Sequence, residues 1–157
     1  MIVTVIEYLV DHSELVPELA RMHFDEWSYL RPNETLAERA ERLGNCCSRK
    51  GIPIAMVALS GGRLSGSAML VGCDMNSRPD LGPWLAGIYV VPDLRGQGLG
   101  TLLIKRMEYE AARQGTRTLF LYTPSTEGLY MSLGWSMLER SEYQGAMVTI
   151  MYKNLFD

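Results

Sequence analysis

The segment with the clearest capacity for chemistry is a glycine-rich turn, Arg-Gly-Gln-Gly-Leu-Gly, at residues 95–100. An apolar run at residues 84–91 precedes it, and a helical pattern begins at Gly98. Glycine lets the backbone approach a ligand closely, and the free N–H groups at a helix start favour an anion. Arg95 adds a guanidinium group, which can bind phosphate oxygens in pairs. The segment therefore predicts a cradle for a phosphate or pyrophosphate group.

The two best-known phosphate-binding patterns fit this turn poorly. A P-loop requires a lysine directly after its last glycine, whereas Thr101 follows Gly100 here. A dinucleotide-binding turn requires a third glycine where Thr101 stands, and it follows the first strand of its domain. A turn without any ligand is the simpler interpretation, but Arg95 and the long amphipathic helix after the turn favour a binding role. A nucleotide-phosphate enzyme is therefore a weak hypothesis.

The elements that would position this turn alternate between strand and helix patterns. Apolar and β-branched runs predict strands at residues 2–9, 54–59, 64–71, 84–91, 118–122, 136–143 and 147–152. Apolar residues at helical spacing predict helices at residues 13–27, 36–47, 98–114 and 125–133. The order β-α-α-β-β-β-α-β-α-β-β indicates a single α+β domain over residues 1–157. We expect a mixed, mostly antiparallel central sheet flanked by helices.

Local signals within these elements bear on the shape of a site. Gly87 lies inside the apolar strand at residues 84–91, where a glycine marks a bulge or a close backbone approach. The polar stretch at residues 74–83, which contains two prolines, predicts a loop before that strand. The second helix begins with a capping box, Thr35 to Glu38. We expect the charged side chains of this helix to form a solvated face: Glu38, Arg39, Glu41 and Arg42.

Three features together resemble the GNAT family of N-acetyltransferases. The pattern Arg95-x-x-Gly98-x-Gly100, preceded by Val-Val-Pro, is similar to the coenzyme A signature of that family. Residues 129–135, Leu-Tyr-Met-Ser-Leu-Gly-Trp, resemble the family's C-terminal L-Y-x-x-x-G-F segment. The predicted order of elements matches the family fold. The resemblance spans essentially the whole chain and implies acetyl transfer from acetyl-CoA to an amine, by direct attack in a ternary complex.

The resemblance also implies how the coenzyme is held. Backbone N–H groups of the glycine turn would bind the pyrophosphate, and the strand at residues 84–91 would pair with the pantetheine arm at a splay beside the strand at residues 118–122. Gly87 would direct an N–H group at the thioester oxygen, where negative charge develops. Relatives often carry an asparagine where Thr123 stands, seven residues before the tyrosine. The expected coenzyme-binding residues are Ile88, Tyr89, Val90, Arg95, Gly96, Gln97, Gly98, Leu99, Gly100, Thr101 and Thr123.

Acetyl transfer also needs an acid and a base. Tyr130 occupies the position of the family's acid for the departing thiolate, although a tyrosine that merely packs is the simpler interpretation. The attacking amine must be neutral, and the strand at residues 84–91 lacks the glutamate that often serves as base. We place Glu26 first, ahead of Asp80 and His23. A base acting through a water molecule is an equal alternative.

The acceptor site is expected near the end of the first helix and the loop before the central strand. The residues predicted to line it are Trp27, Tyr29, Asp80 and Trp84. Arg31 and Arg78 could bind a carboxylate on an amino-acid or peptide acceptor, or could be surface charges. The acceptor is therefore a small-molecule or peptide amine. A non-catalytic acyl-CoA-binding module of the same fold is the alternative function, because the strand glutamate and the asparagine are missing.

Composition and charge exclude several other classes. The 157 residues are 47% hydrophobic with a net charge of −3, which fits a folded domain and disfavours nucleic-acid binding. Three cysteines without a C-x-x-C pattern and two histidines predict no metal site. No basic leader and no apolar stretch of about 18 residues is present, so we expect a cytoplasmic protein without a membrane partner. The last hairpin, with Tyr143 and Tyr152, offers a surface for a homodimer.

Overall fold

The computed structural model describes residues 2–156, and its centre is a seven-stranded sheet in the order β1-β2-β3-β4-β5-β7-β6. Neighbouring strands are antiparallel except for β4 and β5, which are parallel. This topology confirms the predicted α+β fold with a mixed, mostly antiparallel sheet. The strands are β1 (Thr4–Tyr8), β2 (Ile54–Ser60), β3 (Arg63–Val71), β4 (Trp84–Val90), β5 (Thr118–Thr123), β6 (Ser136–Tyr143) and β7 (Ala146–Asn154).

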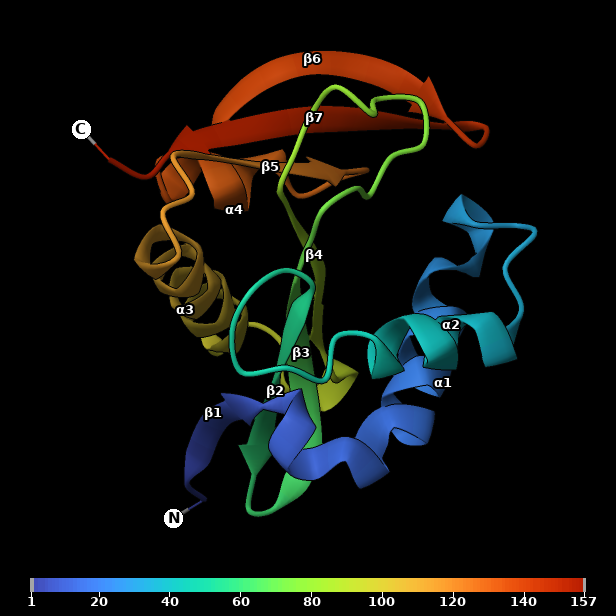
Figure 1. Cartoon of the computed structure of the whole chain (residues 1–157), viewed down its shortest axis with the longest axis vertical. Coiled ribbons are helices and arrows are strands. Elements are labelled where there is room, and N and C mark those ends of the chain that lie inside the picture. Colours follow the sequence, from blue (N-terminus) through green and yellow to red (C-terminus); the bar gives the residue numbers. More distant parts are fainter. Residues whose placement is uncertain (1, 157) are drawn as a thin grey trace.

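Helices cover both faces of this sheet. Helices α1 (Val16–Trp27) and α2 (Leu36–Gly44) lie on one side of the central strands, and α3 (Leu99–Arg113) and α4 (Glu127–Ser132) lie on the other (Figure 1). Helix α1 begins three residues later than predicted, because Pro17 is accommodated in its first turn and Leu9–Leu15 forms a 3-10 segment instead. Among residues 2–156, no helix combines the length and the hydrophobicity that a membrane span requires.

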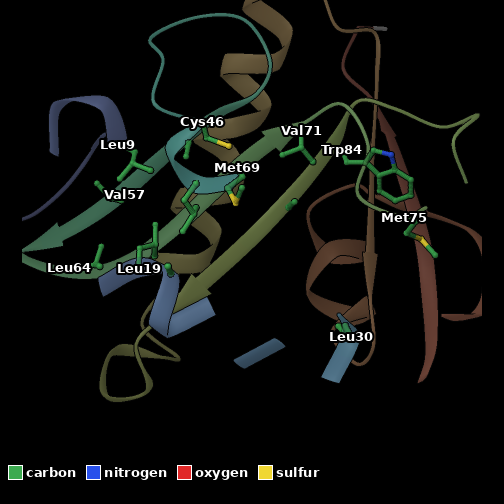
Figure 2. Packing of buried hydrophobic residues seen from close by; sticks show 14 of the residues in the cluster. Leu9, Leu19, Leu30, Cys46, Val57, Leu64, Met69, Val71, Met75 and Trp84 are labelled. Carbon is green, nitrogen blue, oxygen red and sulfur yellow. The ribbon is translucent and has the colours of Figure 1, made fainter. Parts of the chain in front are cut away.

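The two faces of the sheet are packed by two apolar clusters. One lies under α1 and α2 and includes Leu19 and Met69, which Figure 2 shows together with Trp84. The other lies under α3 and includes Leu103 and Met107. Each fully buried aliphatic side chain of this size contributes about 1.5–3 kcal/mol, so the clusters hold the helices firmly against the sheet.

Two irregularities of β4 create room for a site. The strands β4 and β5 share one ladder pair, Trp84 with Phe120, so they diverge beyond it. Gly87 has a φ of +60°, and the ladder between β3 and β4 shifts register at the same point. Ala86 packs on the α1–α2 face, whereas Ile88, two residues on, packs on the α3 face. Since residues two apart in a regular strand share a face, Gly87 forms the predicted bulge.

The last hairpin is closed by Gln144 and Gly145, both with positive φ, as a two-residue turn requires. Its Tyr143 side chain is buried and packs edge-on against Tyr122, with ring centroids 5.4 Å apart. Tyr143 therefore belongs to the core of the chain, and the homodimer stays a prediction.

Candidate active site

A cavity of about 670 Å³ opens where β4 and β5 diverge. Its walls include Gly98 and Tyr130 from the α3 face of the sheet, and Trp27 and Arg39 from the α1–α2 face. The cavity therefore reaches both faces through the splay. This is the geometry that two reactants need when each approaches a shared centre from a different side.

The glycine turn forms one end of this cavity. Gly96 and Gly98 have φ values of +78° and +87°, which glycine adopts without strain, and Gly98 precedes the first residue of α3. No side chain caps this end of the 15-residue helix, so its first N–H groups are free to bind an anion. A Cβ atom at either glycine would meet no atom within 4 Å, so the turn has open space beside it. The turn thus fits the pyrophosphate of a coenzyme.

Most of the predicted coenzyme-binding residues line the cavity, and one does not. The cavity walls include Ile88, Tyr89, Val90, Arg95, Gly96, Gly98, Leu99, Gly100, Thr101 and Thr123. Gln97 instead lines a separate hollow of about 340 Å³ beside β1 and β3. The hydroxyl group of Thr123 lies 2.7 Å from the Thr126 hydroxyl and accepts the Thr126 N–H, so it stabilises the turn after β5.

Buried hydrogen bonds that link His23, Ser67 and the Gly87 carbonyl stabilise the Gly87 bulge. Ser67 donates its hydroxyl proton to the carbonyl oxygen of Gly87 (2.7 Å), and His23 Nε2 lies 2.8 Å from the same hydroxyl oxygen. Because Ser67 has one proton to give, His23 carries its proton on Nε2 and donates it. Burial, together with the nearby Arg39 and Arg42 charges, lowers the pKa of His23 to about 3. His23 is therefore neutral, does not line the cavity, and supports the bulge.

Tyr130 brings its hydroxyl to the coenzyme side of the cavity. The residue lies in α4, its side chain is buried, and its ring packs edge-on against Trp135. Within residues 2–156 its hydroxyl forms no hydrogen bond and is not among the fully buried unpaired polar atoms, although the residue as a whole is buried. Burial raises the pKa of Tyr130 to about 12, so the hydroxyl keeps its proton and acts as a donor. This placement is consistent with the role predicted for Tyr130.

Glu26 and Arg95 meet at the rim of the cavity. Glu26 is the penultimate residue of α1, and its Oε1 lies 3.2 Å from Nη2 of Arg95. Arg95 also donates to the Val90 carbonyl oxygen (2.8 Å) and lies over the Tyr89 ring. The pair is partly exposed, and such pairs contribute about 0–1 kcal/mol, so Arg95 can exchange Glu26 for a phosphate at little cost.

The four predicted acceptor residues separate into two groups. Trp27 and Tyr29 line the cavity. Trp84 is fully buried and donates its indole N–H to the Leu81 carbonyl (2.9 Å), because its position in β4 points it into the α1–α2 core (Figure 2). Asp80 lies on the loop outside the cavity walls, where Arg78 binds its carboxylate. The structure therefore does not bring Trp84 or Asp80 to the site.

The cavity wall also contains charged residues of α2 that were expected to form a solvated face. Arg39 and Arg42 line it, and Arg39 is buried, so the expectation of a solvated face for α2 was wrong for Arg39. The signal was present, because Arg39 follows Leu36 by three residues and precedes Leu43 by four, which places it within the apolar stripe. Arg31 lines the cavity too, paired with Asp74, whereas Arg78 does not line it.

Comparison with models of known protein families identifies the family of the chain. The model of the acetyltransferase (GNAT) family matches residues 16–135, which is well over half of the chain. The chain therefore belongs to the GNAT acetyltransferase family. A sequence comparison with curated proteins found no match.

Solved structures with the same fold cover nearly the whole chain. An aminoglycoside 6'-N-acetyltransferase complexed with coenzyme A superposes with a TM-score of 0.74 at 18% identity, covering 98% of each chain. An N-acetyltransferase from Staphylococcus aureus Mu50 gives 0.75 at 15% identity, covering 98% of this chain and 99% of that one. A ribosomal-protein-alanine N-acetyltransferase from Brucella melitensis gives 0.76 at 18% identity, covering 96% and 99%. These similarities show a shared fold.

Proposed function

We propose that this protein is an acetyl-CoA-dependent N-acetyltransferase that acts on a primary amine of a small molecule or peptide. One observation carries the proposal: a single cavity joins the uncapped glycine turn, the Gly87 bulge and the Tyr130 hydroxyl across the splayed strands β4 and β5. Family membership and the coenzyme A bound to one structural neighbour support acetyl-CoA as the co-substrate.

The chain's own groups have separate roles in this proposal. The N–H groups at the start of α3 bind the pyrophosphate, and Arg95 adds a cation beside them. The free backbone edge of β4 beyond the Trp84–Phe120 pair holds the pantetheine arm as an added strand. When bound, the coenzyme supplies an acetyl thioester. The Gly87 N–H donates to the thioester oxygen as negative charge develops there, and Tyr130 donates its O–H to the departing sulfur.

The attacking amine must lose a proton on the other side of the sheet. Glu26 stays the proposed base. Arg95 releases it when the coenzyme phosphate binds, and its position at the cavity rim favours action through a water molecule. Neither Asp80, which lies outside the cavity, nor the buried His23 is placed to take this proton.

Thiol release from acetyl-CoA, followed across a panel of amines, tests the proposal directly. Release that depends on one class of amine would support the transferase. Coenzyme binding without release for any amine would instead favour the non-catalytic acyl-CoA-binding module.

A pair of variants at Gly98 tests the coenzyme site within the same assay. At Gly98→Asp the new carboxylate occupies the first N–H groups of α3 and repels the pyrophosphate, so we expect coenzyme affinity to fall by at least about 100-fold. Because no atom lies within 4 Å of the added Cβ, the variant should fold, with a backbone cost of about 1 kcal/mol at the positive φ. Gly98→Asn has the same shape without charge and should retain more affinity. Unchanged binding by calorimetry for Gly98→Asp would contradict the assignment of the turn.

A further inference from the structure

The end of the cavity on the α1–α2 face is built from arginine side chains. Arg31, Arg39 and Arg42 line it, and the carboxylates that accompany them belong to Asp74 in the wall and Glu34 behind it. The charge of Arg31 is paired with Asp74, because Nη2 donates to the carboxylate (2.8 Å) and to the carbonyl oxygen (3.1 Å) of that residue. Two guanidinium groups and one carboxylate are left.

Arg39 and Arg42 share Glu34. Arg42 Nη1 donates to Glu34 Oε2 at 2.9 Å, and Arg39 Nε lies 2.7 Å from Glu34 Oε1 in a geometry too bent for a hydrogen bond. One carboxylate cannot neutralise two guanidinium groups, so one positive charge is in excess here. Elsewhere in the cavity wall, Arg95 is balanced by Glu26. Among the described residues, the uncompensated positive charge of the cavity wall therefore lies beside α2.

This charge is held under electrostatic strain. Burial is the largest cause that lowers the pKa of Arg39, and the neighbouring Arg42 charge lowers it further. A guanidinium carries about five N–H donors. Within residues 2–156, however, the side chains of Arg39 and Arg42 together donate a single hydrogen bond, from Arg42 to Glu34. Since both residues line the cavity, their remaining donors are available to a ligand inside it. An anion placed there gains charge-assisted hydrogen bonds and relieves the repulsion.

We propose that the acceptor is a small primary amine that also carries a carboxylate, and that Arg39 and Arg42 bind this carboxylate. The inference rests on the proposed acetyltransferase function, because it assigns the α1–α2 end of the cavity to the acceptor. Trp27 and Tyr29 form the wall at this end together with the arginines, so the ligand's carbon chain meets aromatic surface. The amine reaches the Gly87 bulge from the face opposite the glycine turn. A polycationic amine meets the same excess positive charge and is repelled.

Matched amines that differ in one charge test this inference. The substrates are α-, β- and γ-amino acids, each with its methyl ester, and a diamine such as putrescine as the polycation. Acetyl-CoA thiol release gives kcat/KM for each. We expect an amino acid to exceed its own ester by roughly 10- to 100-fold, because the ester loses a hydrogen-bonded charge. We expect putrescine to be the poorest substrate.

The variant Arg42→Gln tests which residue binds the carboxylate. Arg42 is partly exposed, so its replacement should leave the fold intact, and circular dichroism and an unchanged KM for acetyl-CoA confirm this. The KM for the preferred amino acid should rise about 10-fold or more, and the preference over the ester should shrink. Arg21→Gln removes an exposed arginine from α1 outside the cavity and should change neither value.

The outcomes separate the two proposals. Esters or putrescine matching the amino acids would overturn the carboxylate inference and leave the acetyltransferase proposal standing. An increase in the KM for acetyl-CoA in Arg42→Gln, without a change for the amine, would also overturn it, because the arginines would then belong to the coenzyme site. Thiol release with none of the amino acids, their esters or putrescine would contradict the proposed function and the inference with it.

Discussion

Replacement of Tyr130 by phenylalanine removes one hydroxyl group and keeps the ring that packs against Trp135 at 6.0 Å. Within residues 2–156 that hydroxyl has no hydrogen-bond partner and is not fully buried, so the free energy of unfolding should change by less than about 1 kcal/mol. Any loss of activity in Tyr130→Phe would then arise at the site and not from unfolding.

The size of the activity loss follows from what the hydroxyl can do. With a pKa of about 12, Tyr130 is a weaker acid than an ordinary thiol, whose pKa is about 8.5. Full proton transfer from Tyr130 to the departing thiolate is therefore uphill, and donation of a hydrogen bond is its main contribution. A hydrogen bond to a charged group is worth about 1.5–3 kcal/mol, which predicts a kcat lowered roughly 10- to 150-fold.

Steady-state thiol release, measured from pH 6 to 10, checks this prediction. Because the raised pKa keeps Tyr130 protonated throughout, the variant should show the same pH dependence as the parent at a lower plateau. The KM for acetyl-CoA should hardly move. Tyr109→Phe, at an exposed tyrosine on α3, is the matched control and should behave as the parent. Equal kcat values for Tyr130→Phe and the parent would refute the role of Tyr130.

Two further predictions concern the bulge and its support. In Gly87→Ala the new Cβ would lie 2.6 Å from Met69 Sδ at a φ of +60°. Urea unfolding should therefore show a free energy of unfolding lower by about 2 kcal/mol or more, and kcat should fall because the Gly87 N–H is redirected. Unchanged stability would contradict the tight packing. For His23 the folded pKa of about 3 lies below the unfolded value of about 6.5, so the unfolded state binds more protons between them. The free energy of unfolding should fall as pH drops below about 6.5, by up to about 1.4 kcal/mol per pH unit from this group. In His23→Gln the free energy of unfolding should depend less steeply on pH. Equal slopes in the variant and the parent would exclude His23 as the cause.

Much of the fold and half of the site follow from local sequence patterns. The glycine turn requires positive φ at Gly96 and Gly98, and the alternation between β and helical periods sets the order of the elements. These signals are readable because they reflect backbone conformations that few residue types adopt and apolar faces that must be buried. The bulge at Gly87 was predictable for the same reason, since a glycine inside an apolar strand has few other uses.

The acceptor side of the cavity depended on tertiary structure. Trp84 was expected to line the site, and the strand's register turns it into the core instead. Arg39 was expected in solvent, and the packing of α2 against α1 buries it beside Glu34 and the cavity. Which face a long side chain meets, and how many carboxylates lie near it, depends on residues brought together from distant parts of the chain. The charge of the acceptor site is therefore a property of the folded arrangement, because no local pattern carries the sum of charges around a cavity.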